Sequence, residues 1–255
     1  MRYAAVGDSF TEGVGDEPAP GVLRGWADLV AAGLAAGTGE RIEYANLAVR
    51  GRLLNQIVTD QVPAALSMTP TPTLLTFNGG GNDMMRPGAD LARLRALTRR
   101  AVRLVVDAGV RLVILSGADP SARLPFGRAL HRRGAVLTEA LAELAAGSDV
   151  AFVNVFADAE IRRPDYWSAD RLHLGPAGHR RVASLVLAEL GHQVAAHAVE
   201  PAPVAPRRVL DEAVYYRRYV LPWVNRHLRG RSSGDGLTGK HAEWVPVEPI
   251  PLDVA

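Results

Sequence analysis

Short apolar segments alternate with longer amphipathic segments along the first 195 residues of this chain. The apolar segments are predicted β-strands: Arg2–Val6, Ile42–Leu47, Thr73–Phe77, Val110–Leu115 and Val150–Val155. The segments with helical spacing are predicted helices: 25–36, 53–66, 89–108, 127–146 and 176–190. Strands that are apolar on both sides are buried on both faces, and strands that alternate with helices pair in parallel. The sequence therefore predicts an α/β fold, a doubly wound three-layer α/β/α sandwich with a flavodoxin-like five-stranded parallel sheet of order 2-1-3-4-5.

The composition of the chain changes near residue 195, so we expect a main domain over 1–195 and an extension over 196–255. The extension is predicted to contain a linker, an amphipathic helix that Pro222 kinks or breaks, a Ser/Gly-rich loop and an extended tail: 198–207, 209–228, 231–240 and 244–252. Its aromatic residues should pack either on their own domain or on a second subunit. The second arrangement would make the protein a homo-oligomer.

The composition argues against several classes of protein. The formal net charge is +2, and the best candidate for a basic face, residues 207–231, is a single helical stretch with acidic residues near its start, so we expect no nucleic-acid partner. We expect no membrane span, because no run of eighteen apolar residues occurs. The first candidate site begins at residue 7, which leaves no room for a signal peptide of about 15–30 residues, and cytoplasmic residence is therefore expected. The absence of cysteine excludes disulfides and thiolate catalysis.

Polar and glycine residues follow four of the predicted strands. Ser9 follows the first strand, Gly51 the second and Asn82 the third, while Asp170 and His173 follow the fifth. Ligands of doubly wound sheets bind at the carboxyl ends of the strands, near the point where the strand order reverses. We therefore expect these residues to meet at one edge of the sheet, with Ser9 opposite Asn82.

Each of these residues has a structural explanation when taken alone. Ser9 would suit a helix cap, Asp170 a turn, His173 an exposed loop, and Gly51 and Asn82 loop positions. Together they suit nucleophilic catalysis, which needs a nucleophile, a base and a group that orients the base. Asp170 and His173 would share one face of a helical turn. Gly51 N–H, the Asn82 amide and Ser9 N–H would suit an oxyanion hole.

The glycine run at 79–81, followed by Asn82 and Asp83, has a second interpretation as a phosphate-binding nest. It lacks the lysine and the spacing of a P-loop, which argues against that interpretation.

Four blocks of the sequence resemble those of the GDSL, or SGNH, hydrolases, and they occur in the family's order. They are Gly7-Asp8-Ser9-Phe10-Thr11-Glu12-Gly13, Asn46-Leu-Ala-Val-Arg-Gly51, Gly80-Gly81-Asn82-Asp83 and Asp170-Arg-Leu-His173. The resemblance implies a Ser-His-Asp triad of Ser9, His173 and Asp170, and an oxyanion hole of Ser9, Gly51 and Asn82. It also implies hydrolysis of esters, thioesters or carbohydrate-linked acyl groups. It covers residues 7–173 and implies nothing about the tail from residue 200.

The expected substrate is a small acyl ester, and we expect neither a cofactor nor a metal, because the remaining histidines have no metal-ligand spacing. Trp167, Arg123 and Met84 are candidates for the substrate pocket, although Trp167 would also suit core packing. His179 is expected to be structural. Two alternatives stay open: an acyltransferase that uses the same triad with an acceptor other than water, and a binding module without turnover. The complete set of site residues argues against the binding module.

Overall fold

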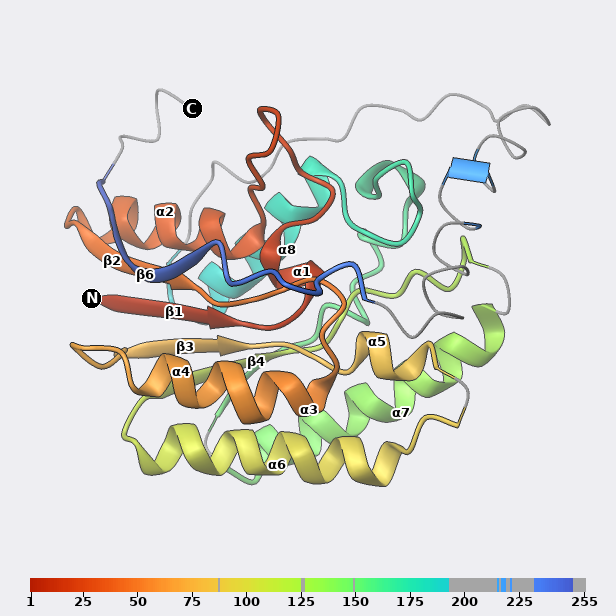
Figure 1. Cartoon of the computed structure of the whole chain (residues 1–255), viewed down its shortest axis with the longest axis horizontal. Helices are drawn as coiled ribbons and strands as arrows, with labels where there is room; N and C mark the ends of the chain where they lie inside the picture. The colour runs from red at the N-terminus through yellow and green to blue at the C-terminus, as the bar shows by residue number, and fades with distance from the viewer. Residues whose placement is uncertain are drawn as a thin grey trace.

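The computed structural model describes residues 1–86, 88–124, 127–148, 150–192 and 232–249, together with residues 215, 217, 218 and 221. In this part of the chain a six-stranded sheet lies between two layers of helices (Figure 1). The strands are β1 (Arg2–Val6), β2 (Ile42–Asn46), β3 (Leu74–Phe77), β4 (Arg111–Leu115), β5 (Ala151–Val153) and β6 (His241–Val247). The predicted three-layer α/β/α architecture is confirmed.

The two helical layers differ in composition. One layer contains α2 (Trp26–Thr38) and α8 (Pro176–Glu189). The other contains α3 (Leu54–Gln56), the π-helical turn η1 (Ile57–Gln61), α4 (Val62–Leu66), α6 (Leu91–Asp107) and α7 (Gly127–Ala146). Three short helices lie at the ends of strands or in loops: α1 (Ser9–Glu12), α5 (Gly81–Met84) and η2 (Pro164–Tyr166).

The sheet has two cores, one on each face. Along β1, Tyr3 and Ala5 belong to the core under α2 and α8, whereas Ala4 and Val6 belong to the core on the other face. All four side chains are fully buried. A strand that is covered on both sides has apolar residues at every position, which is why β1 reads as a continuous apolar run in the sequence.

The strand order is β5-β4-β3-β1-β2-β6. Strands β1 to β5 are parallel and follow the predicted relative order. The prediction of a five-stranded, all-parallel sheet is wrong, however, because β6 pairs antiparallel with β2, with Ile42 opposite Val247 and Asn46 opposite His241. Without β6, strand β2 would present an open edge. Strand β6 contains Pro246, which has no N–H to donate to a ladder and is therefore confined to edge strands such as β6.

Several helix boundaries differ from the sequence-based expectation. The expected helix at 25–36 continues through Gly37 and ends at Thr38, with Gly39 as its C-cap. The expected helix at 53–66 is interrupted by η1, a change from α- to π-helical hydrogen bonding that its apolar spacing does not reveal. The expected linker at 198–207 and most of the expected helix at 209–228 lie outside the described residues. No helix among the described residues is long and apolar enough to cross a membrane.

Candidate active site

Ser9 is the first residue of α1, in the turn that follows β1. Asp8 caps this helix, since its Oδ1 accepts a hydrogen bond of 3.1 Å from the Phe10 N–H. The interpretation of Ser9 as the helix cap is therefore wrong. The Ser9 hydroxyl is hydrogen-bonded to His173, whereas the Asp8 side chain orders the turn.

Gln61 holds the same turn from the other side. Its side-chain Oε1 accepts from Gly7 N–H at 2.8 Å, and its Nε2 donates to the Gly7 carbonyl at 2.9 Å. Gln61 is the last residue of η1, and its side chain is buried. Both backbone polar groups of Gly7 are thus satisfied by one amide, which fixes the peptide just before Asp8 and Ser9. Sequence reasoning missed Gln61, because nothing in its local pattern distinguishes it from an ordinary helix residue.

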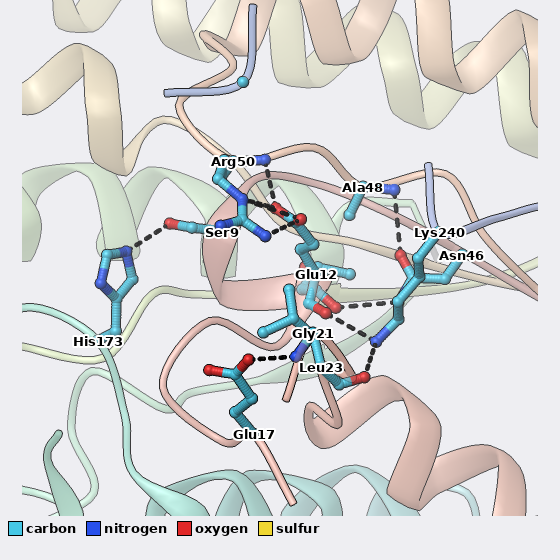
Figure 2. Close-up of polar contacts among 12 residues, drawn as sticks. Ser9, Glu12, Glu17, Gly21, Leu23, Asn46, Ala48, Arg50, His173 and Lys240 are labelled. Carbon is cyan, nitrogen blue, oxygen red and sulfur yellow. Dashed lines mark hydrogen bonds and ion pairs between the residues drawn. The ribbon is translucent and has the colours of Figure 1, made fainter. Parts of the chain in front are cut away.

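His173 and Asp170 complete a chain of hydrogen bonds that begins at Ser9. The Ser9 Oγ lies 2.9 Å from His173 Nε2, and His173 Nδ1 lies 2.5 Å from Asp170 Oδ2 (Figure 2 shows the Ser9–His173 contact). The structure therefore brings together three residues that are up to 164 positions apart in the sequence. This is the arrangement in which a histidine can take a proton from a serine while a carboxylate fixes the imidazole tautomer.

Asp170 and His173 lie in a tight turn rather than on the predicted helical turn, so that prediction is wrong. The turn is closed by the bridge between Trp167 and Leu174 and by the Ser168 N–H, which donates to the His173 carbonyl at 2.9 Å. The short loop leaves Asp170 free to accept from backbone N–H groups within its own turn, which a helix would use internally.

The carboxylate of Asp170 is held in its charged form. Its Oδ1 accepts from the Ser168 hydroxyl at 2.7 Å and from the Leu172 and His173 N–H groups at 3.0 and 2.9 Å. Burial by itself would raise the pKa of Asp170, but the hydrogen bonds and the charge of His173 outweigh burial and lower it below the ordinary value. A carboxylate at this position therefore stays ionised and able to stabilise a protonated His173.

Gly51 lies in the turn after β2 with a φ of +73°, a conformation that glycine adopts without strain. Its neighbour Arg50 is fixed by Glu12: the Arg50 N–H donates to Glu12 Oε2 at 2.6 Å, and the Arg50 guanidinium contacts Glu12 Oε1, also at 2.6 Å (Figure 2). Glu12 is buried, although it carries a charge, because Arg50 pairs with it. Gly51 itself is not among the residues that line the cavity described below.

Asn82 begins α5 together with Gly81 and lies beside Asp8. Its Nδ2 donates to Asp8 Oδ2 at 3.1 Å and to the Arg52 carbonyl at 3.0 Å. The amide donors of Asn82 are thus occupied by protein acceptors in this structure. Sequence reasoning placed Asn82 near Ser9 correctly, since both line the same cavity, but it did not foresee the contact with Asp8.

Asp8 is a buried carboxyl group between Ser9 and Asn82. Burial raises its pKa to about 6, and the hydrogen bond from Phe10 N–H and the nearby His173 offset only part of this rise.

A mainly apolar cavity of about 110 Å³ opens beside Ser9 and His173. Its walls come from α1, α5, α7 and the loops after β4 and β5, and the apolar side chains among them are Phe10, Met84, Met85, Ala118, Leu130, Leu137, Leu141, Phe156, Trp167, Leu172 and Leu174. One water-sized group needs roughly 10–15 Å³ of such volume, so the cavity has room for several carbon atoms.

Of the three expected pocket residues, Met84 and Trp167 line this cavity and Arg123 does not. Arg123 instead stacks on the Trp167 ring, with its guanidinium carbon 4.6 Å from the ring centroid. The Trp167 indole N–H donates to the Ile161 carbonyl at 2.6 Å, so Trp167 is also packed in the core.

The loop after β4 contributes Asp119 to a charged cluster whose members the sequence does not single out. Asp119 lines the cavity, and its Oδ2 contacts His131 Nδ1 at 2.7 Å and the Arg162 guanidinium at 2.6 Å. Burial would raise the pKa of Asp119, but hydrogen bonds from Ser121, His131 and Arg162 lower it. Among the described residues, no three or more His, Asp or Glu side chains are grouped so that they could hold a metal ion.

A comparison with protein families finds one match over most of the main domain. The family model of GDSL-like lipases and acylhydrolases matches residues 5–181, a range that contains Ser9, Gly51, Asn82, Asp170 and His173. No curated protein matches the chain.

Solved structures with a similar fold include several esterases. TesA shares 21% identity with this chain, with a TM-score of 0.61. The match covers 76% of this chain and 100% of the TesA chain. A catalytic mutant of Axe2, an acetylxylan esterase from Geobacillus stearothermophilus, shares 18% identity with a TM-score of 0.61, covering 74% of this chain and 94% of its own. The psychrotrophic esterase EstA from Pseudoalteromonas sp. shares 16% identity with a TM-score of 0.58. The match covers 74% of this chain and 96% of EstA. At these identities the likeness shows the fold alone.

Proposed function

The chain belongs to the GDSL-like lipase and acylhydrolase family, and we propose that it hydrolyses carboxylic esters with Ser9 as the nucleophile. The observation that carries this proposal is the continuous hydrogen-bonded chain from the Ser9 hydroxyl through His173 to Asp170. Esterases among the similar solved structures, one of them an acetylxylan esterase, support the choice of esters as the substrate class.

In the proposed first step, His173 Nε2 takes the proton of Ser9 as the hydroxyl oxygen attacks the acyl carbonyl carbon. Asp170 holds the Nδ1–H tautomer of His173 and stabilises the imidazolium that forms. The tetrahedral intermediate then collapses, and His173 returns the proton to the departing alcohol. This leaves the acyl group on Ser9.

In the second step, water attacks the acyl-enzyme with His173 again as the base, and the carboxylic acid departs as Ser9 recovers its proton. The apolar cavity beside Ser9 is the proposed acyl site, because an acyl chain there buries its methylene groups at about 0.8 kcal/mol each.

The proposed oxyanion donors are the Ser9 N–H, the Gly51 N–H and the Asn82 Nδ2. The Asn82 amide now donates to Asp8, so a developing oxyanion would compete with the Asp8 carboxylate for that donor. We therefore propose that Asp8 holds the Asn82 amide close to its working position before substrate binds.

The test is hydrolysis of short p-nitrophenyl esters by purified protein, compared with the Ser9→Ala variant. Wild-type protein should hydrolyse the esters and be labelled by a fluorophosphonate probe, whereas Ser9→Ala should lose both properties, because removal of the nucleophile costs roughly 10⁶-fold in kcat. Ser67→Ala, at an exposed serine after α4, is the matched control and should behave as wild type. A wild-type protein that is inert to both reagents would refute the assignment of Ser9.

A further inference from the structure

The C-terminal segment Ser232–Val247 lies against the loop that carries Gly51. Gly239 is packed so closely that a Cβ there would lie 2.5 Å from Leu47 Cα, and a Cβ on Gly234 would lie 2.0 Å from the Arg50 carbonyl oxygen. These are contacts between two backbones, which leave no space for a side chain. The segment thus covers the loop from outside and continues into β6 along the edge of β2.

Lys240 attaches this segment to the nucleophile helix. Its ammonium group donates to the Glu12 carbonyl at 2.7 Å, to the Leu23 carbonyl at 3.1 Å and to Asp28 Oδ2 at 2.6 Å, as Figure 2 shows in part. An ammonium group has three donor hydrogens, so each finds an acceptor. The Lys240 side chain is only 16% exposed.

Glu12 connects Lys240 to the Gly51 loop. Its backbone carbonyl, at the end of α1, accepts from Lys240, while its carboxylate accepts from the Arg50 N–H at 2.6 Å. Asn46 adds a parallel contact, because its Nδ2 donates to the Thr11 carbonyl at 3.0 Å. The helix that begins at Ser9 and the turn that contains Gly51 are therefore connected through Glu12. Lys240 binds the backbone carbonyl of that same residue.

Lys240 is also distinctive in the amino-acid composition of the chain. Lys240 is the single lysine of the chain, among 29 basic residues, and it lies outside the range 5–181 that the family model matches. An ammonium group on a slender stem can reach three convergent acceptors, whereas the broad, planar guanidinium of arginine is directed to fork-shaped partners.

We propose that Lys240 is a positioning residue for the oxyanion hole, so that the C-terminal extension supports the active site without lining it. This proposal rests on the proposed function of Ser9 and Gly51. Lys240 does not line the cavity; it acts by holding the Glu12 end of α1, and the Glu12 carboxylate in turn accepts from the Arg50 N–H next to Gly51. Oxyanion contacts act mainly in the transition state, so their displacement lowers kcat more than it raises KM.

The experiment compares Lys240→Met and Lys240→Arg with wild type in full-length protein. Lys240→Met should lower kcat for p-nitrophenyl acetate by roughly 10- to 100-fold, the range expected for a displaced catalytic contact, and should change KM by less than about threefold. Inactivation by the fluorophosphonate should slow in parallel. Lys240→Arg keeps the charge and should recover part of kcat.

Trp244→Phe is the matched control. Trp244 lies on the same segment and donates to the Pro70 carbonyl at 3.0 Å, away from α1. Its replacement removes one hydrogen bond from the segment and should lower the melting temperature while kcat stays within about twofold of wild type. An equal loss of kcat in Trp244→Phe, or an unchanged kcat in Lys240→Met, would overturn the proposal.

Asp28→Asn tests the same Lys240 contact if Lys240→Met does not fold. Asparagine keeps an oxygen for the Gly25 N–H, which Asp28 now accepts at 2.6 Å, but removes the charge that faces Lys240. It should lower kcat severalfold, and an unchanged kcat would again overturn the proposal. Inert wild-type protein would instead refute the function of Ser9, so the two failures are distinguishable.

Discussion

At the scale of single residues, Asp8 is a carboxyl group whose burial disfavours its charged form. It caps α1 through Phe10 N–H and accepts from Asn82, yet it is only 4% exposed. Burial raises its pKa from 3.8 in the unfolded chain to about 6 in the folded protein. The folded state therefore binds the Asp8 proton more tightly, and the resulting stability is fully present below pH 3.8 and is lost as the pH rises through about 6.

We expect Asp8→Asn to remove this part of the pH dependence. Asparagine is nearly as good a helix cap as aspartate and carries no charge. The melting temperature of Asp8→Asn relative to wild type should therefore rise between about pH 4 and pH 7. Thermal unfolding by circular dichroism across that range measures the difference. A difference that stays constant with pH would contradict the raised pKa of Asp8.

The residues of the candidate site were predictable from the sequence where they form local blocks. Ser9, Gly51, Asn82, Asp170 and His173 each follow a strand, and parallel strands end at one edge of the sheet.

Their supporting contacts were not predictable. Gln61, Asp119 and Lys240 reach the site or its supports from elements that carry no motif of their own. A side chain of this kind is identified only once the tertiary fold supplies its partners.

At the scale of secondary-structure elements, His179 joins the start of α8 to the start of α2. Its Nδ1 accepts from Trp26 N–H at 3.2 Å and its Nε2 lies 3.2 Å from the Val14 carbonyl, so the neutral tautomer with a proton on Nε2 satisfies both groups. The side chain is completely buried, and burial lowers its pKa from 6.5 to about 4. His179 thus has the structural role expected of it.

Two substitutions of His179 should separate its hydrogen bonds from its titration. His179→Leu leaves the buried Trp26 N–H and the part-buried Val14 carbonyl without this partner and should destabilise the protein by about 2–4 kcal/mol, whereas His179→Gln, which can replace both bonds, should cost less.

The stability of the wild-type protein should also decrease in acid because of His179. Because the folded pKa of His179 is lowered, wild-type protein should lose stability as the pH falls from 6.5 through about 4, and both variants should lack that component. Urea unfolding at several pH values measures both effects. Equal acid sensitivity in wild type and His179→Gln would rule out this contribution.

At the scale of the whole molecule, the cavity beside Ser9 is built by elements from most of the main domain. Helix α7 supplies one wall through Leu130, Gly134, Leu137, Thr138 and Leu141, while α5 and the Trp167–Leu174 turn supply others. The length of acyl chain that this proposed acyl site accepts therefore depends on how these elements pack.

We expect Leu130→Trp to shift the preference towards shorter acyl chains. Leu130 is partly exposed and lines the cavity, so a larger ring can occupy the cavity without repacking a buried core. The kcat/KM for octanoate relative to acetate p-nitrophenyl esters should fall by roughly tenfold or more. Val136→Trp, on the same helix but 49% exposed and outside the cavity, should keep the wild-type profile. An unchanged profile in Leu130→Trp would place the acyl chain elsewhere.

The sequence by itself determined the alternation of strands and helices, the relative order of the five parallel strands and the strands after which the candidate site residues follow: Ser9, Gly51, Asn82, Asp170 and His173. These follow from hydrophobic periodicity, which acts over a few residues, and from the rules of parallel crossovers.

Only the tertiary structure decided that β6 closes the edge of β2, that Gln61 fixes Gly7 from 54 residues away and that Lys240 contacts Glu12 across 228 residues. Such contacts depend on where distant segments meet after packing, and an open strand edge or an unpaired carbonyl does not specify in the sequence which segment will satisfy it.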